Sequence, residues 1–270
     1  MKTLKNHTLI YDSQCPMCNL YSKGFIRSGM LDENGREAFT ELTFDTKNII
    51  DFNRAKNEIA FVNYKDKNVI YGLDSLLLII GNSFPLLEKI ARIKPLHWFF
   101  KKLYSFVSYN RKQIMPSAKD NSADACVPDF NLKYRLAYIA FVVLFSSYIL
   151  SIFTARLGLN LNRNFAREFI ICLGQIFWQT VFLKWYLKEK LWDYLGNMMT
   201  VSLIGTLLLI PSLFLNLNSV LSILYFGIVI FIMFLEHIRR CKILNLNFLP
   251  IISWMIFRIT VLAILIYLNY

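Results

Sequence analysis

Five long apolar segments fill the second half of this chain and constrain its fold more than any other feature. They are residues 134–153, 166–187, 194–215, 220–236 and 248–268. A helix needs about 20 predominantly apolar residues to cross the hydrocarbon core of a bilayer, and each segment is close to that length. The chain is also 56% hydrophobic, too apolar for an ordinary soluble protein of 270 residues. We therefore predict an all-α transmembrane bundle of about five helices.

The first half of the chain has a different composition. Residues 1–133 hold 19 Lys or Arg and 14 Asp or Glu, whereas residues 134–270 hold 11 and 4. The predicted domains are a soluble domain over 1–112, a polar linker over 113–133 and the transmembrane domain over 134–270. The basic residues are dispersed, and in the second half they lie at the ends of apolar segments. They indicate loops beside membrane helices, so the bilayer is the expected partner and nucleic acid is not.

The positions of the basic residues also orient the apolar segments. With the N-terminal domain inside, the cytoplasmic side holds basic groups at 133–135, 184–190 and 239–242, and the outer side holds one group, at 156–167 in the first loop. Cytoplasmic loops carry an excess of Lys and Arg, which favours a multi-pass protein with a cytoplasmic N-terminal domain. Residues 1–6 do not resemble a signal peptide.

Two cysteines three positions apart lie in T-L-I-Y-D-S-Q-C-P-M-C-N-L, residues 8–20. The residues before the cysteines are typical of a strand, and Pro16 suits the first turn of a helix. Cys15 is then expected at the start of that helix, where free N–H groups and the helix dipole stabilise a thiolate. Cys18 follows almost one turn later. The pair predicts dithiol–disulfide exchange, with Cys15 as the attacking thiolate and Cys18 as the resolving thiol.

Two other interpretations of the cysteine pair stay open. Such a pair can be half of a zinc site, but the further ligands that the sequence offers, His7, His97 and Cys126, are scattered singly, and we predict no metal site. The pair can also be two inert thiols in a core. Cys126 itself lies in the predicted linker. We expect an unpaired surface thiol there, with disulfide exchange with the active pair as the alternative.

The cysteine motif resembles that of the DCC-type thiol-disulfide oxidoreductases, a thioredoxin-like family. The family pattern is matched by Asp12, Cys15, Pro16 and Cys18. Weaker family marks follow: Tyr71 and Gly72 after a hairpin, a helix carrying Asp74, and the pair Asn110 and Arg111. The resemblance covers roughly residues 7–112. It implies dithiol–disulfide exchange without a cofactor, and it gives Cys15 the role of nucleophile and Cys18 that of resolving thiol.

The order of predicted elements in the first half is also that of a thioredoxin-like α/β domain. After the motif strand and helix, we expect a strand at 38–44, with Leu42 and Phe44 on its core side, and a short helix within 45–56. A hairpin is expected from 59–64 and 68–71, followed by a short helix at 73–80. A longer amphipathic helix should begin at Pro95. We expect its apolar side chains to face the core, with placement on an anionic membrane surface as the alternative.

Two acidic residues in this half have two possible roles. Asp12 can relay a proton to or from Cys18, and its charge should raise the pKa of Cys15. The alternative is a structural role in capping the following turn. Asp74, at the start of its predicted helix, has the same two roles, and we expect it to support the site rather than to react.

Three polar residues lie inside the apolar segments. Arg258 falls near the middle of the last one, and Gln175 and Gln179 are four residues apart in the second. A charged side chain at that depth should face the bundle interior and have partners. We expect these three residues to form a polar cluster, either a structural lock or a binding site for a quinone-like or anionic ligand.

The preferred function is a membrane-anchored thiol-disulfide oxidoreductase that works on the cytoplasmic face, where the redox poise favours reduction of disulfides. The substrate class is a disulfide-bearing protein or a small thiol compound. A non-enzymatic transporter or scaffold with a structural or metal-binding cysteine module is the alternative. A redox relay from the thiols to a quinone is the third hypothesis.

Overall fold

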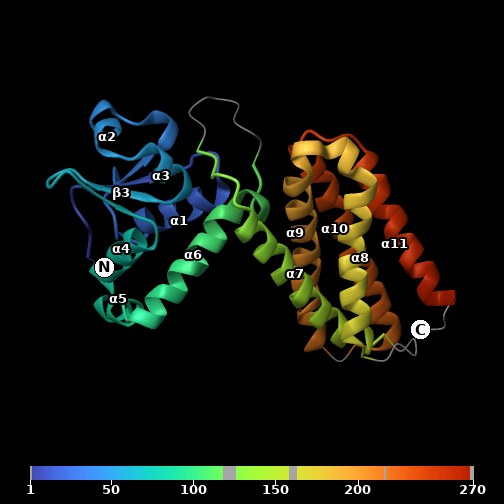
Figure 1. Ribbon diagram of the computed structural model, residues 1–270. Helices are drawn as coiled ribbons and strands as arrows, with labels where there is room; N and C mark the ends of the chain where they lie inside the picture. Colours follow the sequence, from blue (N-terminus) through green and yellow to red (C-terminus); the bar gives the residue numbers. More distant parts are fainter. Residues whose placement is uncertain (1, 118–125, 158–162, 216, 268–270) are drawn as a thin grey trace. The chain divides into compact units, whose positions relative to one another are not determined.

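The computed structural model describes residues 2–117, 126–157, 163–215 and 217–267. The chain divides into two compact units, Met1–Tyr134 and Arg135–Tyr270. The first holds a small mixed α/β sheet domain and the second holds long apolar helices (Figure 1). The predicted fold class is confirmed for both halves.

A four-stranded sheet forms the centre of the N-terminal domain, in the order β2-β1-β3-β4. Its strands are β1 (His7–Tyr11), β2 (Arg36–Ala38), β3 (Ala60–Asn63) and β4 (Asn68–Tyr71). Strand β1 pairs in parallel with β2 and antiparallel with β3, and β3 forms the predicted hairpin with β4. The two inner strands, β1 and β3, are buried along most of their length. The residues that follow β1 therefore emerge from the middle of the sheet.

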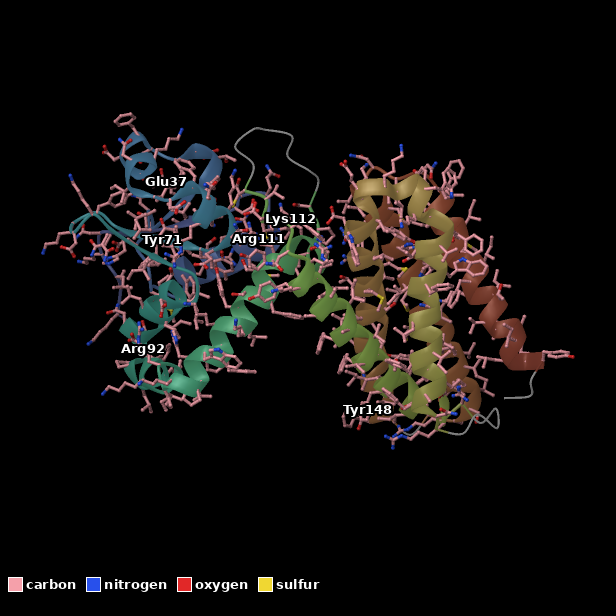
Figure 2. All side chains as sticks on the ribbon, in the orientation of Figure 1. Glu37, Tyr71, Arg92, Arg111, Lys112 and Tyr148 are labelled. Carbon is pink, nitrogen blue, oxygen red and sulfur yellow. The ribbon has the colours of Figure 1, made fainter. Side chains whose placement is uncertain are left out.

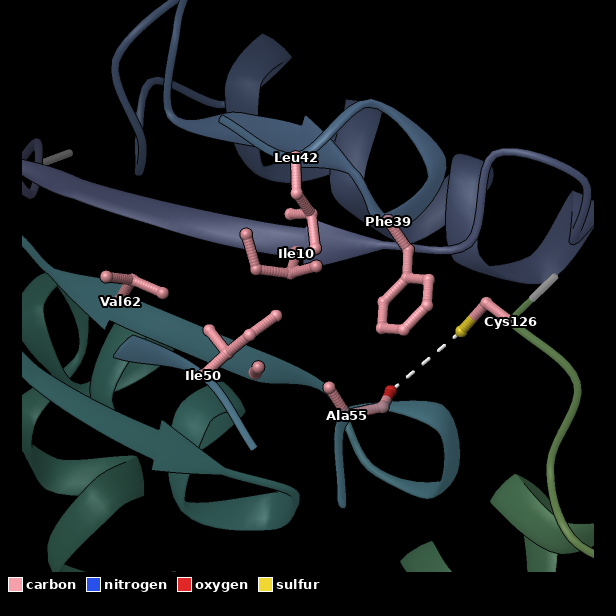
Figure 3. Packing of buried hydrophobic residues seen from close by; sticks show 8 residues of the cluster. Ile10, Phe39, Leu42, Ile50, Ala55, Val62 and Cys126 are labelled. Atoms are coloured by element: carbon pink, nitrogen blue, oxygen red, sulfur yellow. Dashed lines mark hydrogen bonds between the residues drawn. The ribbon is translucent and has the colours of Figure 1, made fainter. Parts of the chain in front are cut away.

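Seven helices accompany the sheet in the described part of this domain. They are α1 (Pro16–Arg27), η1 (Phe39–Glu41), α2 (Phe44–Ile49), α3 (Phe52–Asn57), α4 (Leu73–Ser83), α5 (Pro85–Ala91) and α6 (Lys94–Ile114). Because neighbouring side chains of a strand point to opposite faces, the sheet separates two hydrophobic clusters. Leu9 and Phe61 belong to one, and Ile10 and Val62 belong to the other (Figure 3).

The predicted strand at 38–44 is wrong. Strand β2 ends at Ala38, and Phe44, expected in the core, is 78% exposed as the first residue of α2. The cause is local capping: Thr43 is the N-cap of α2, and its side chain accepts a hydrogen bond from the Thr46 N–H. A Thr N-cap satisfies a free donor of the first turn, which outweighs the alternating pattern of a strand. Of the two predicted core residues, only Leu42 is buried.

Helix α6 begins close to the predicted position but does not bury all of its apolar face. Phe99 and Leu103, expected in the core, are 54% and 45% exposed. The residues that α6 does bury lie near its C-terminal end, at Ser108, Asn110, Arg111 and Gln113. The core-facing prediction is therefore wrong for the first half of this helix. Its C-terminal end instead places polar side chains inside the domain.

The described part of the C-terminal unit holds five α-helices: α7 (Leu132–Thr154), α8 (Phe165–Leu187), α9 (Leu191–Leu209), α10 (Ser219–Ile243) and α11 (Leu249–Tyr267). Two 3-10 turns accompany α9, namely η2 (Lys188–Lys190) and η3 (Pro211–Leu213). By length and hydropathy, four helical segments are able to cross a membrane, and the second, Phe165–Leu213, contains both α8 and α9. Helices α8 to α11 lie alongside one another (Figure 1).

Candidate active site

The turn between β1 and α1 places Cys15 at the start of a helix. The Cys15 N–H donates to the Asp12 carbonyl at 3.1 Å, which closes the turn. The Cys15 carbonyl then accepts the first helical hydrogen bond, from the Asn19 N–H at 3.0 Å. Cys15 is the N-cap of α1, and Pro16 occupies the first helical position, where its missing N–H costs nothing. The predicted strand, turn and helix are therefore present, with both cysteines on the first turn.

The two thiols of this turn have opposite acidities. Hydrogen bonding from the Cys18 thiol, helped by the nearby Cys18 backbone N–H and the charge of Arg111, lowers the pKa of Cys15 from 9.0 to about 6. Burial and the Asp12 charge act against this shift. The hydrogen bond to Cys15, together with burial, raises the pKa of Cys18. At neutral pH the pair is therefore one thiolate and one thiol, as an attacking and a resolving cysteine require.

Arg111 supplies a buried positive charge to this site from the end of α6. Its side chain is only 7% exposed and lies 3.7 Å from the Asp12 carboxylate. One of its terminal nitrogens also donates to the carbonyls of Lys56 and Cys126, both at 3.0 Å. The guanidinium thus links the turn between β1 and α1, the end of α3 and the chain after α6. Figure 2 labels Arg111 and its neighbour Lys112.

The Asp12 side chain makes the structural contact that was one of the two roles considered for it. Its Oδ1 accepts a hydrogen bond from the Gln14 N–H at 3.0 Å, which stabilises the turn. Its Oδ2 faces Arg111 and, at 3.4 Å, the ammonium group of Lys112. The side chain is buried, and its charge raises the pKa of Cys15 as expected. Asp12 therefore holds the turn in shape and balances the positive charge of Arg111.

Cys126 is buried, so the expected surface thiol is wrong. Its residue is 8% exposed and packs in the cluster around Ile10 and Phe39 (Figure 3). The thiol points toward the Ala55 carbonyl at 3.9 Å, and a terminal nitrogen of Arg111 donates to its sulfur at 3.4 Å. Burial raises the pKa of Cys126 to about 11 despite that nearby charge. Cys126 is therefore a protonated core thiol at neutral pH.

Gly72 and Asp74 shape the domain on the side of α4. Gly72 precedes α4 with φ +68°, a conformation that favours glycine, and a Cβ there would meet the Glu58 carboxylate at 3.0 Å. Asp74 is paired with His97 at 3.0 Å and with Arg92 at 3.4 Å. Both partners follow α4 in the sequence, so the recorded contacts of Asp74 link α4 to α5 and α6 rather than to the cysteines.

The residues considered as extra zinc ligands have other partners. His7 donates from Nδ1 to the Lys5 carbonyl at 2.7 Å, and its ring stacks on Phe61. His97 pairs with Asp74, and Cys126 with Arg111. Among the residues that the structure describes, no three His, Cys, Asp or Glu side chains are grouped so that they could hold a metal ion.

The three polar residues predicted to cluster in the bundle are divided between two places. Gln175 and Arg258 line one cavity. Gln179 is absent from its lining, and its Oε1 accepts a hydrogen bond from the Tyr194 hydroxyl at 3.2 Å. Tyr194 in turn lies 3.4 Å from Nε2 of His237. The sequence analysis did not single out Tyr194 or His237, because single aromatic or histidine residues in an apolar helix give no periodic signal.

Comparison with known proteins finds a family model that matches the N-terminal half of the chain. Residues 9–116 match the family model described as DCC1-like thiol-disulfide oxidoreductase. The match begins in β1, includes Cys15, Cys18 and Arg111, and ends just after α6, before Cys126. No curated protein and no solved structure matches the chain. The N-terminal half of this chain is therefore similar to the DCC1-like thiol-disulfide oxidoreductase family over residues 9–116.

Proposed function

We propose that this chain is a membrane-anchored thiol-disulfide oxidoreductase that reduces disulfides on the cytoplasmic face. The observation that carries the proposal is the pair of unequal thiols on the first turn of α1, with the pKa of Cys15 lowered to about 6 and that of Cys18 raised. The family match supports thiol-disulfide chemistry in general. The direction of reduction follows from the reducing poise of the cytoplasm.

The reaction has two exchange steps. The Cys15 thiolate attacks one sulfur of a substrate disulfide, so a mixed disulfide forms and the first substrate thiolate leaves. Cys18 then loses its proton and attacks the Cys15 sulfur, which releases the second substrate thiolate and leaves a Cys15–Cys18 disulfide. The substrate gains two electrons and the pair loses two. An external dithiol or thiol must return those electrons before the next cycle.

Asp12 is a suitable acceptor for the Cys18 proton. A buried resolving thiol with a raised pKa attacks slowly unless a base removes its proton. The Asp12 carboxylate is 5% exposed and belongs to the turn that carries the pair. Its Oδ2 lies in ion pairs with Arg111 and Lys112 but accepts no hydrogen bond within the described residues, which leaves a lone pair open to a proton. We assign to Asp12 this relay in addition to its structural role.

Substrate access requires a local opening, because Cys15 is 0% exposed. A disulfide cannot reach a fully covered sulfur, and the thiolate must be accessible to react. Local opening of a loop costs less free energy than global unfolding, and active sites commonly use it. Thiol-disulfide exchange should therefore be slower than the lowered pKa of Cys15 alone would predict.

Helices α5 and α6 support placement of the domain at a membrane surface. Their exposed apolar side chains are Leu86, Leu87, Ile90, Leu96, Trp98, Phe99 and Leu103. The same helices carry the basic residues Lys89, Lys94, Lys101 and Lys102. An amphipathic helix of this composition binds the anionic cytoplasmic leaflet. The chain's own apolar helices begin at α7, 18 residues after the last residue of α6.

Trapping of mixed disulfides tests the proposed function. With Cys18→Ser, the second step cannot occur, so the variant should accumulate covalent adducts with a model disulfide or with cellular partners in native membranes. Non-reducing gels followed by mass spectrometry should detect them. The double variant Cys15→Ser with Cys18→Ser is the control and should form none. If Cys18→Ser forms no more adduct than this control, Cys15 is not the nucleophile.

A further inference from the structure

One arginine inside the helical bundle has no carboxylate partner. Arg258 lies in the middle of α11, in a segment able to cross a membrane. Its recorded contact is with its neighbour on the same helix, Trp254, whose ring centre is 4.9 Å from the guanidinium carbon. A positive charge at such a depth is costly unless a counter-charge or hydrogen bonds compensate it.

The other buried arginines of the bundle each have an acidic partner. The pairs are Arg135 with Asp193 (3.4 Å), Arg167 with Glu168 (2.7 Å) and Arg240 with Glu236 (2.7 Å). Residues 134–270 contain only 4 acidic residues, and the fourth, Glu189, lies in η2 at the end of α8. This half of the chain therefore leaves no acidic side chain to neutralise Arg258.

Arg258 lines a cavity that also contains unsatisfied hydrogen-bonding groups. The cavity has a volume of about 50 Å³, and Gln175, Cys172 and Ser202 are among its polar lining. Gln175 is only 4% exposed, and both of its amide atoms, like Nε of Arg258, have no hydrogen-bond partner within the described residues. A buried polar atom without a partner costs about 1–3 kcal/mol, so the two donors among these atoms, Nε of Arg258 and Nε2 of Gln175, favour a group in the cavity that accepts hydrogen bonds.

We infer that this cavity binds a monovalent anion. The Arg258 guanidinium supplies the opposite charge, and the Gln175 Nε2 supplies a second donor. The volume admits a few water-sized groups, since one needs roughly 10–15 Å³, which suits a halide or a carboxylate and excludes a larger phosphate ester. Binding would neutralise the unpaired charge and satisfy the orphaned donors at once. The inference does not depend on the thiol chemistry of the N-terminal domain.

Two sources can supply such an anion. One is a free inorganic anion such as chloride, and the other is the head group of a fatty acid from the bilayer. A neighbouring groove of about 490 Å³ between α8 and α11 is lined mainly by apolar side chains. It shares Ile171 and Phe257 with the cavity, so an acyl chain has a place beside the head-group position.

Equilibrium binding to the purified, delipidated full chain tests this inference. Radiolabelled chloride and radiolabelled oleate are titrated separately, in a nonionic detergent with divalent sulfate as the only other anion. At least one should bind saturably at one site per chain. We expect binding about tenfold or more weaker in Arg258→Gln, because a charge-assisted hydrogen bond is lost, and less weakened in Gln175→Leu. Arg163→Gln, outside the cavity lining, is the charge-matched control and should bind normally.

The binding results distinguish an aqueous anion from a lipid carboxylate, and either of these from a cavity that holds only water. Saturable chloride binding identifies an aqueous anion, and oleate binding without chloride binding identifies a lipid carboxylate. If Arg258→Gln does not fold, Arg258→Lys should retain weakened binding and Gln175→Leu still reports on the site. If neither anion binds saturably, or binding is unchanged in Arg258→Gln and Gln175→Leu, the cavity holds water only and the inference is overturned.

Discussion

Replacement of Cys15 by serine is expected to lower the rate of disulfide reduction by about 10³-fold or more. A serine hydroxyl stays protonated at neutral pH, whereas the pKa of the Cys15 thiol is lowered to about 6. The measurement is reduction of a small-molecule disulfide by the full chain, with an excess of dithiol reductant. Cys172→Ser, which removes a lone thiol of α8, is the matched control and should keep the wild-type rate. Equal rates in the two variants would contradict the assignment of Cys15.

The pH dependence of Cys15 alkylation tests the lowered pKa of this thiol independently of the rate of disulfide reduction. The rate with a neutral alkylating agent should rise with pH and level off above an inflection near pH 6, because only the thiolate reacts. The folded pKa lies below the ordinary value of 9.0, so ionised Cys15 stabilises the reduced fold fully above about pH 9. That contribution is lost as the pH falls from 9 through 6. An inflection near 9 would show that the thiol is not acidified.

Replacement of Arg111 by glutamine is expected to have the second-largest effect, on both stability and acidity. The change leaves the buried Asp12 carboxylate without its guanidinium and removes the hydrogen bonds to the Lys56 and Cys126 carbonyls. Removal of one partner of a buried ion pair costs about 3–5 kcal/mol of folding free energy. The pKa of Cys15 should rise, because the Arg111 charge lowers it.

Hydrogen exchange of the β1 and β3 amides in the full chain measures the stability change of this domain, and the alkylation profile measures the acidity. Lys112→Gln is the control, since its ammonium group lies 3.4 Å from the same carboxylate but is more exposed, at 21%. We expect it to cost about 1 kcal/mol or less. Asp12→Asn should partly rescue Arg111→Gln, because the unpaired buried charge is then absent. Similar losses of folding free energy in Lys112→Gln and Arg111→Gln would show that Arg111 stabilises this domain no more than Lys112 does.

Local signals in the sequence were enough to predict the catalytic turn and much of the sheet. Pro16 fixes the start of α1, and the apolar runs on either side of residues 65–67 define the β3–β4 hairpin. The strand predicted at 38–44 failed because one hydrogen bond to Thr43 starts a helix there. An alternating pattern cannot reveal such a cap, since the same residues satisfy both descriptions.

The role of Arg111 and the burial of Cys126 could not be predicted, because both depend on contacts between distant parts of the chain. The sequence identified Arg111 only as part of a weak family motif at the end of the domain. Its position follows from the way α6 brings it to Asp12, 99 residues earlier in the chain. Cys126 was placed in a polar linker, where an exposed thiol is the usual expectation. Packing against Ile10 and Phe39 depends on the tertiary fold, which no local pattern describes.

A redox titration of the cysteine pair tests the central claim most directly. The full chain is equilibrated at graded glutathione potentials and alkylated, and the mass shift counts the free thiols. We predict that Cys15 and Cys18 lose their reactivity together in a two-electron transition, with a tenfold change in the equilibrium per 30 mV or so. Either Cys15→Ser or Cys18→Ser should abolish this transition. Two cysteines that oxidise independently, or that stay protected by a stoichiometric zinc ion in the purified protein, would contradict the account.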